Sequence, residues 1–143
     1  GRDVFYNVED GTLVEMKGKR TILADKKREI MDVFAHELAS YDAMDEQEKR
    51  ISGGWINRDE LIKQVFGLSV TGINAASSSD IKNSFWYHIR EVRKILQEYA
   101  KSDPGVDLIE TRRAGRSESY YRLNPKVFVV EKLAEKEPEK EGA

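Results

Sequence analysis

The 143-residue sequence contains no cysteine and only two histidines, His36 and His88. The lack of cysteine excludes a disulfide framework, thiolate-held metals and cysteine nucleophiles, and it fits a reducing compartment such as the cytoplasm. The histidines do not form the closely spaced pair that binds zinc in hydrolases. We expect His36 to be a surface side chain and His88 to be packed at the edge of a buried helix face. The sequence predicts no metal site and no cofactor.

The sequence also lacks the signals of membrane proteins and enzymes. Its apolar runs are far too short to span a bilayer, and residues 1–3 do not resemble a signal peptide. We therefore expect no membrane contact, and the chain fits one domain of a longer protein. No phosphate-binding glycine loop, dinucleotide fingerprint or Ser/His/Asp arrangement is present. We expect that the protein is not an enzyme.

Positive charge is concentrated in one stretch of the chain, although the net charge of the whole is −2. Residues 82–125 hold nine Lys/Arg and six Asp/Glu, a net charge of +3. Residues 1–50 hold nine and twelve, a net charge of −3. Such a local excess indicates an anionic partner better than the total charge does. The basic stretch includes the arginines Arg90, Arg93, Arg112, Arg113 and Arg116.

The first third of the chain predicts a small sheet covered by a helix. Hydrophobic residues make up 39% of the sequence, which is enough for the core of one domain. Three β-rich segments, 4–8, 13–16 and 21–23, are separated by glycine-containing turns and predict an antiparallel sheet. Apolar residues recur at helical spacing over residues 30–41. Residues 42–50 either prolong that helix or form an exposed loop.

Two more helices are predicted downstream. Asn57 followed by Glu60 is typical of a helix N-terminus, and Gly67 would end this second helix. A loop over residues 68–79 then leads to the third helix. Its apolar face carries Phe85, Ile89, Val92 and Leu96, which we expect to pack against Phe34, Leu38, Leu61 and Val65. Its opposite face carries Asn83, Tyr87, Arg90 and Lys94.

A hairpin is predicted after the third helix, with strands over 106–110 and 120–123 and an arginine-rich tip at 112–117. The element order predicts an α+β fold of the winged helix-turn-helix kind. It has a three-helix core, a short N-terminal antiparallel sheet and a C-terminal β-hairpin wing, all within residues 1–125. Residues 126–143, rich in Glu and Lys, are expected to form a C-terminal extension that is disordered at its end.

The third helix and the hairpin together predict sequence-specific binding of double-stranded DNA. An α-helix fits the major groove, and an arginine at a hairpin tip can enter the adjacent minor groove. Two alternatives stay open. A basic helix face is often only solvated. The acidic total charge, Glu91 and the aromatic pair Trp86 and Tyr87 instead favour a winged-helix protein-interaction module that does not bind DNA, although Trp86 fits a core flank equally well.

Three segments resemble motifs of the OmpR/PhoB-type winged helix-turn-helix domains of transcription regulators. Residues 85–96, FWYHIREVRKIL, are similar to the recognition helix, often V-D-V-H-I-x-x-L-R-x-x-L. Residues 56–67, INRDELIKQVFG, resemble V-S-R-E-E-L-L-x-x-V-W-G. Residues 108–113 and 121–123 resemble the wing, I-x-T-V-R-G-x-G-Y-R-L. The motifs occur in the family's order, and the resemblance covers residues 4–123.

The resemblance implies a recognition helix over residues 80–100 in the major groove and a wing in the minor groove. The loop from Leu68 to Ser79 sits where the family can touch RNA polymerase, and a homodimer on DNA stays open. Glu91 differs from the family, which often has Arg at this position. Thr111 and Tyr121 match positions that often touch phosphate. The helix faces and the resemblance together predict DNA contacts from Asn83, Ser84, Tyr87, Arg90, Arg93, Lys94, Thr111, Arg113, Arg116 and Tyr121.

Overall fold

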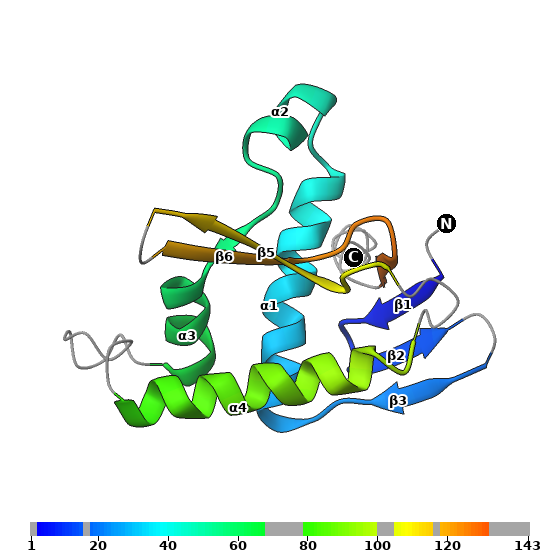
Figure 1. The fold of residues 1–143 in the computed structure, drawn as a ribbon. Coiled ribbons are helices and arrows are strands. Elements are labelled where there is room, and N and C mark those ends of the chain that lie inside the picture. The colour runs from blue at the N-terminus through cyan, green and yellow to red at the C-terminus, as the bar shows by residue number, and fades with distance from the viewer. Residues whose placement is uncertain (1–2, 16–17, 68–78, 100–104, 116–117, 132–143) are drawn as a thin grey trace, which may run out of the picture.

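The computed structural model describes residues 3–15, 18–67, 79–99, 105–115 and 118–131 (Figure 1). These residues form an α+β fold with four helices and two small sheets. The helices are α1 (Asp25–Asp42), α2 (Glu46–Ile51), α3 (Arg58–Phe66) and α4 (Ser79–Leu96). The strands are β1 (Val4–Asn7), β2 (Thr12–Glu15), β3 (Arg20–Ile22), β4 (Ile56–Asn57), β5 (Ile109–Ala114), β6 (Glu118–Leu123) and β7 (Phe128–Glu131).

The larger sheet has the strand order β3-β2-β1-β7 and the smaller one the order β4-β6-β5. Strands β1, β2 and β3 form the expected antiparallel meander. Strand β7, however, pairs with β1 in parallel, with Val4 opposite Phe128. The antiparallel pairing of the first three strands is confirmed, whereas the sequence does not predict this fourth, parallel strand. The parallel strand buries Phe128 completely, and local periodicity carries no information about pairing between segments so far apart.

The connection from β6 to β7 is a turn built around Asn124. The side-chain amide of Asn124 donates to the carbonyl oxygen of Asp107 at 2.9 Å, and its Oδ1 accepts from the backbone N–H of Lys126 at 2.9 Å. Val127 and Phe128 are then buried in the core. The first residues of the predicted C-terminal extension therefore pack on the same body as the sheets. Its end, residues 132–143, lies outside the described residues.

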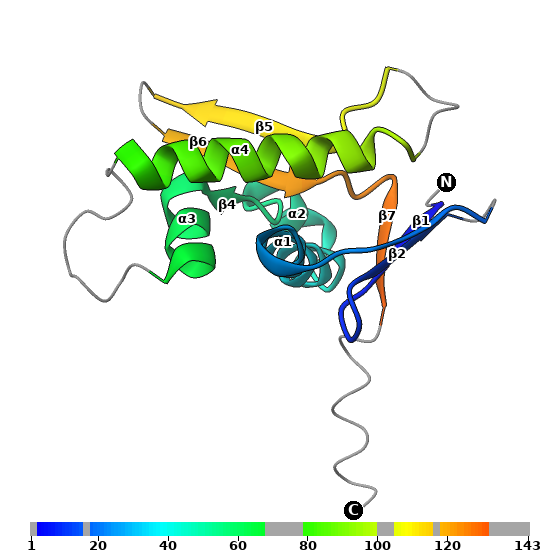
Figure 2. The same ribbon diagram turned by 90° about the horizontal axis from the view of Figure 1, so that it is seen from below.

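One hydrophobic core joins the sheets to helices α1, α3 and α4 (Figure 2). Helix α2 contributes no buried side chain, so the helical part of the core comes from α1, α3 and α4. Of residues 42–50, Asp42 is the last residue of α1, residues 43–45 connect the two helices, and residues 46–50 belong to α2, a separate helix with a capping box between Asp45 and Glu48. The predicted core residues are all buried: Phe34, Leu38, Leu61, Val65, Phe85, Ile89, Val92 and Leu96.

The N-terminus of α3 is capped by Asn57, as the sequence predicts. Its Oδ1 accepts from the backbone N–H groups of Asp59 at 2.8 Å and Glu60 at 3.3 Å. Replacing Asn57 with Ala should lower the free energy of unfolding by about 1 kcal/mol, because both N–H groups lose their acceptor. Urea denaturation measures the effect, with Lys63→Ala on the exposed face of α3 as the control. Equal stability of the two variants would contradict this role for the cap.

Candidate nucleic-acid interface

The surface that the sequence predicts to bind DNA combines one face of α4 with the β5–β6 hairpin. Asn83, Arg90 and Lys94 are exposed along α4, as the helical spacing predicts. Tyr87, on the same face, is 50% exposed. Lys94 makes a surface ion pair with Glu91 at 3.4 Å, and such a pair contributes little energy. The face therefore offers an exposed guanidinium, an ammonium, an amide and a phenol.

The hairpin is longer than the sequence predicts. Strands β5 and β6 pair from Ile109 opposite Leu123 to Ala114 opposite Glu118. Arg112 and Arg113 therefore lie in a strand, and the prediction that they belong to the tip is wrong. The strand ends only where Gly115 adopts a φ of +79°, a conformation that glycine reaches without strain. Arg116 lies outside the described residues.

Arg93 connects the two elements. Its guanidinium donates to the carbonyl oxygen of Ile109 and to Oγ1 of Thr111, both at 3.3 Å. The hairpin and α4 also extend in the same general direction in both views (Figures 1 and 2). Two of the predicted contact residues, Arg93 and Thr111, are thus bonded to each other. Arg93 acts as a structural tie, and its guanidinium has fewer donors left for DNA than that of Arg90.

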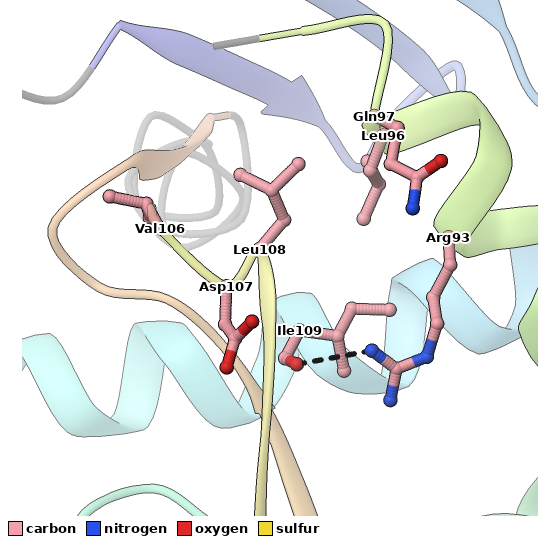
Figure 3. A pocket seen from close by; sticks show the side chains of 7 residues that line it. All are labelled: Arg93, Leu96, Gln97, Val106, Asp107, Leu108 and Ile109. Atoms are coloured by element: carbon pink, nitrogen blue, oxygen red, sulfur yellow. Dashed lines mark hydrogen bonds between the residues drawn. The ribbon is translucent and has the colours of Figure 1, made fainter. Parts of the chain in front are cut away.

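A shallow pocket of about 100 Å³ lies beside this tie, between the C-terminal end of α4 and the start of β5 (Figure 3). Leu96 and Leu108 form its apolar wall, and Arg93 and Asp107 lie at its polar side. The guanidinium of Arg93 is the group already bonded to Ile109. The pocket is the gap that remains where the helix and the strand diverge.

Tyr121 is placed differently from an open contact residue. It is only 3% exposed, and its ring packs against Phe85 with the ring centroids 6.2 Å apart. The ring therefore belongs to the core. Among the described residues no hydrogen bond to the Tyr121 hydroxyl is found, so this oxygen is the part of the side chain left to contact a partner. Any DNA contact from Tyr121 is limited to this oxygen.

The positive charges of three arginines act on the Tyr121 side chain. Burial raises the pKa of Tyr121, and the positive charges of Arg58, Arg93 and Arg113 oppose this rise. The strand register explains the arrangement. Tyr121 lies opposite Thr111 of β5 and Ile56 of β4, and Arg113 and Arg58 follow those two partners by two residues each. The guanidinium groups thus come from α3, α4 and β5.

Arg58 is absent from the residues that the sequence predicts to contact DNA. It directly follows the N-cap of α3 and contacts its neighbour, with Nε 3.3 Å from Oδ1 of Asp59. Its proximity to Tyr121 depends on the pairing of β4 with β6. Strand β4 has only two residues, Ile56 and Asn57, and so short a strand leaves no periodic signal in a sequence.

Ser84, the last predicted contact residue that the structure describes, lies with His88 on the flank of α4 opposite to Arg93 and Trp86. Ser84 is half-buried, and its carbonyl oxygen lies 2.8 Å from Nδ1 of His88. The His88 ring also meets Phe66 of α3 edge-on, with the ring centroids 6.3 Å apart, so the expected packing of His88 at the edge of the buried face is confirmed. Trp86 is 43% exposed and lies edge-on against Phe85. An aromatic ring this exposed is available to a macromolecular partner.

Among the described residues no three His, Cys, Asp or Glu side chains gather as a metal site would require, and no described helix combines the length and the apolar character needed to cross a bilayer. The chain matches no family model, no curated protein and no solved structure.

Proposed function

We propose that this protein binds double-stranded DNA as the winged helix-turn-helix effector domain of a transcription regulator. Helix α4 would lie in the major groove as the recognition helix, and the β5–β6 hairpin would serve as the wing in the minor groove. The element order supports this assignment, because α3 and α4 pack together and a two-stranded hairpin follows them. RNA polymerase contact through residues 68–79 and dimer formation on DNA belong to the same proposal. Residues 68–78 lie outside the described residues.

The observation that carries the proposal is the Arg93 bridge from α4 to β5. The bridge holds the exposed guanidinium groups of Arg90 and Arg113 on neighbouring elements. Arg58, whose positive charge acts on Tyr121 together with those of Arg93 and Arg113, adds a further cation in the same region. DNA presents negative charge along two strands, and a surface that spans a groove and its flanking phosphates needs positive groups on more than one element.

Titration of a labelled duplex by fluorescence anisotropy tests the proposal. The apparent affinity should fall steeply between about 50 and 200 mM salt, because phosphate contacts release counterions. Replacing Arg90 with Ala should cost about 1–3 kcal/mol on a preferred site and relax the preference for one base pair, if it contacts a base edge. Replacing Arg113 should weaken binding to all DNA sequences alike, if this side chain contacts a phosphate. The slope of log affinity against log salt should then become shallower by about one unit.

Arg50→Ala is the matched control, since Arg50 is an exposed arginine on α2, away from α4 and from the hairpin (Figure 1). This change should leave duplex affinity unaltered. A wild-type protein that binds no duplex at low salt would refute the proposed function. So would an affinity that is insensitive to both the Arg90 and the Arg113 change.

A protein-interaction module is the second candidate, and the exposure of Trp86 and Tyr87 on α4 favours it. Aromatic side chains of this size are enriched in protein interfaces. In that case the same surface would tolerate high salt, because apolar burial rather than phosphate contact would supply the affinity. Absence of duplex binding at low salt is the outcome that would move the conclusion to this candidate.

A further inference from the structure

The two faces of the β5–β6 hairpin contact different parts of the molecule. Residues directly opposite each other in an antiparallel pair point to the same side. One face, here called the α4 face, carries Thr111, Arg113 and Tyr121, and it meets α4 through Arg93 and Phe85. The other, here called the outer face, carries Arg112 and Arg122 from β5 and β6 together with Tyr120.

On the outer face, guanidinium groups of the hairpin alternate with aromatic rings in a column. One of these rings, Trp55, belongs to the turn that follows α2. The Arg112 guanidinium lies 5.1 Å from the Trp55 ring and 5.6 Å from the Tyr120 ring. The Arg122 guanidinium lies 4.4 Å from the Trp55 ring and 5.2 Å from the Tyr41 ring of α1. The Trp55 indole is thus in contact with one guanidinium from each strand of the hairpin.

The turn before Trp55 is shaped to hold the indole in this place. Gly53 and Gly54 have φ angles of +63° and +71°, and a Cβ on Gly53 would lie 2.8 Å from the Trp55 ring. The carbonyl oxygen of Gly53 accepts from the Arg122 guanidinium at 2.6 Å. Arg122 also pairs with Glu110 at 2.7 Å. The column therefore rests on a backbone turn that only glycine adopts easily.

The end of the hairpin has few strand partners, although Ser119 there is only 7% exposed. Strand β4 pairs with β6 only at Tyr120 and Tyr121. Among the described residues, the last two hairpin pairs, Arg113–Ser119 and Ala114–Glu118, have no third strand beside them. A two-stranded ribbon on its own is marginally stable. The direction of this ribbon is set by the Arg93 tie and the Phe85–Tyr121 ring contact on the α4 face and by Trp55 on the outer face.

We infer that Trp55 is a positioning residue, which fixes the direction of the hairpin and so places Arg113 relative to Arg90 on α4. The inference rests on the proposed DNA binding, but its first consequence is visible without DNA. Replacing Trp55 with Leu removes both cation–π contacts of the indole. Amide order parameters of residues 112–114 should then fall from about 0.85 towards 0.6, while those of α4 stay high. Trp55→Phe keeps a ring in place and should behave like the wild type.

Duplex binding supplies a second measurement. Trp55→Leu should lower the affinity for duplex DNA about fivefold, because a mobile hairpin must be ordered on binding. Arg113→Ala should then cost less in the Trp55→Leu background than in the wild type, whereas Arg90→Ala should cost the same in both. A merely structural role for Trp55 would give additive effects at both arginines. Ile51→Ala, at a 71% exposed apolar side chain on α2, is the control.

The outcomes separate this inference from the proposed function. A wild type that binds no duplex refutes the function, and the order parameters still decide the role of Trp55. Hairpin amides that stay rigid in a folded Trp55→Leu protein overturn the inference. Additive effects of Trp55→Leu and Arg113→Ala on duplex binding overturn it as well. If Trp55→Leu does not fold, Arg112→Gln replaces it, since Arg112 is exposed and supplies one side of the indole contact. Rigid hairpin amides in that variant again count against the inference.

Discussion

Replacing Phe85 with Ala should lower the free energy of unfolding by roughly 3–5 kcal/mol, as the removal of a large buried ring does. Phe85 is fully buried on α4, and its ring packs against Trp86 and Tyr121. The loss would therefore affect the attachment of α4 to the strand that forms the hairpin. Because neighbouring side chains are anchored in a sheet, we expect them to fill the cavity only in part. Guanidinium or thermal denaturation measures the change.

Asn83→Ala is the control for this prediction, because Asn83 is exposed on the same helix. Its effect should stay within about 0.5 kcal/mol, as is usual for surface positions. The difference in unfolding free energy between Phe85→Ala and Asn83→Ala tests which face of α4 is buried. If Phe85→Ala and the wild type had the same melting temperature, another face of α4 would have to be buried. The assignment of Arg90 to the exposed face would then be wrong as well.

Reversing the charges of Arg90 and Arg113 together should weaken duplex binding by about a hundredfold or more at low salt. Both side chains are exposed, one on α4 and one on β5. The double variant Arg90→Glu/Arg113→Glu removes two attractions and adds two repulsions along the phosphate backbone. The slope of log affinity against log salt should become shallower by about two units. Anisotropy titrations at several salt concentrations give both quantities.

The matched control is Arg50→Glu/Lys126→Glu, which changes the net charge by the same amount. Arg50 lies on α2 and Lys126 in the turn before β7, and both are exposed. This variant should retain affinity within a few fold, since distant charges are screened beyond about 10 Å at ordinary salt. Equal losses in the two double variants would show that total charge, and not the α4 and hairpin surface, governs the interaction.

Sequence periodicity predicts the helices and the core well, because both depend on local spacing. Ile89, Val92 and Leu96 are buried on α4 for the same reason that they recur at helical intervals. Asn57 likewise caps α3 through N–H groups only two and three residues away. In each case the residues that interact are close in the sequence, so their spacing is enough to predict the contact.

The features that the sequence does not predict depend on distant pairing. Strand β7 joins β1, and β4 joins β6, across long stretches of chain. These pairings bring Phe128 into the core and Arg58 near Tyr121. The interior position of Tyr121 is similar in origin, since a strand residue faces the core or the solvent according to what lies above the sheet. The neighbouring residues in the sequence do not show whether Tyr121 faces the core or the solvent.

The parallel pairing of β1 with β7 also has a mechanical consequence. Val4 lies opposite Phe128 and Asn7 opposite Glu131, and backbone bonds such as those from Val4 to Val127 and from Val8 to Glu131 connect the segments. A force that pulls the start of β1 away from the end of β7 acts along both strands. The hydrogen bonds between β1 and β7 are then loaded in shear and resist the force together. The antiparallel β1–β2 hairpin, pulled at its open end, would instead unzip one bond at a time. We expect tension between these two points to be resisted first by the β1–β7 pair.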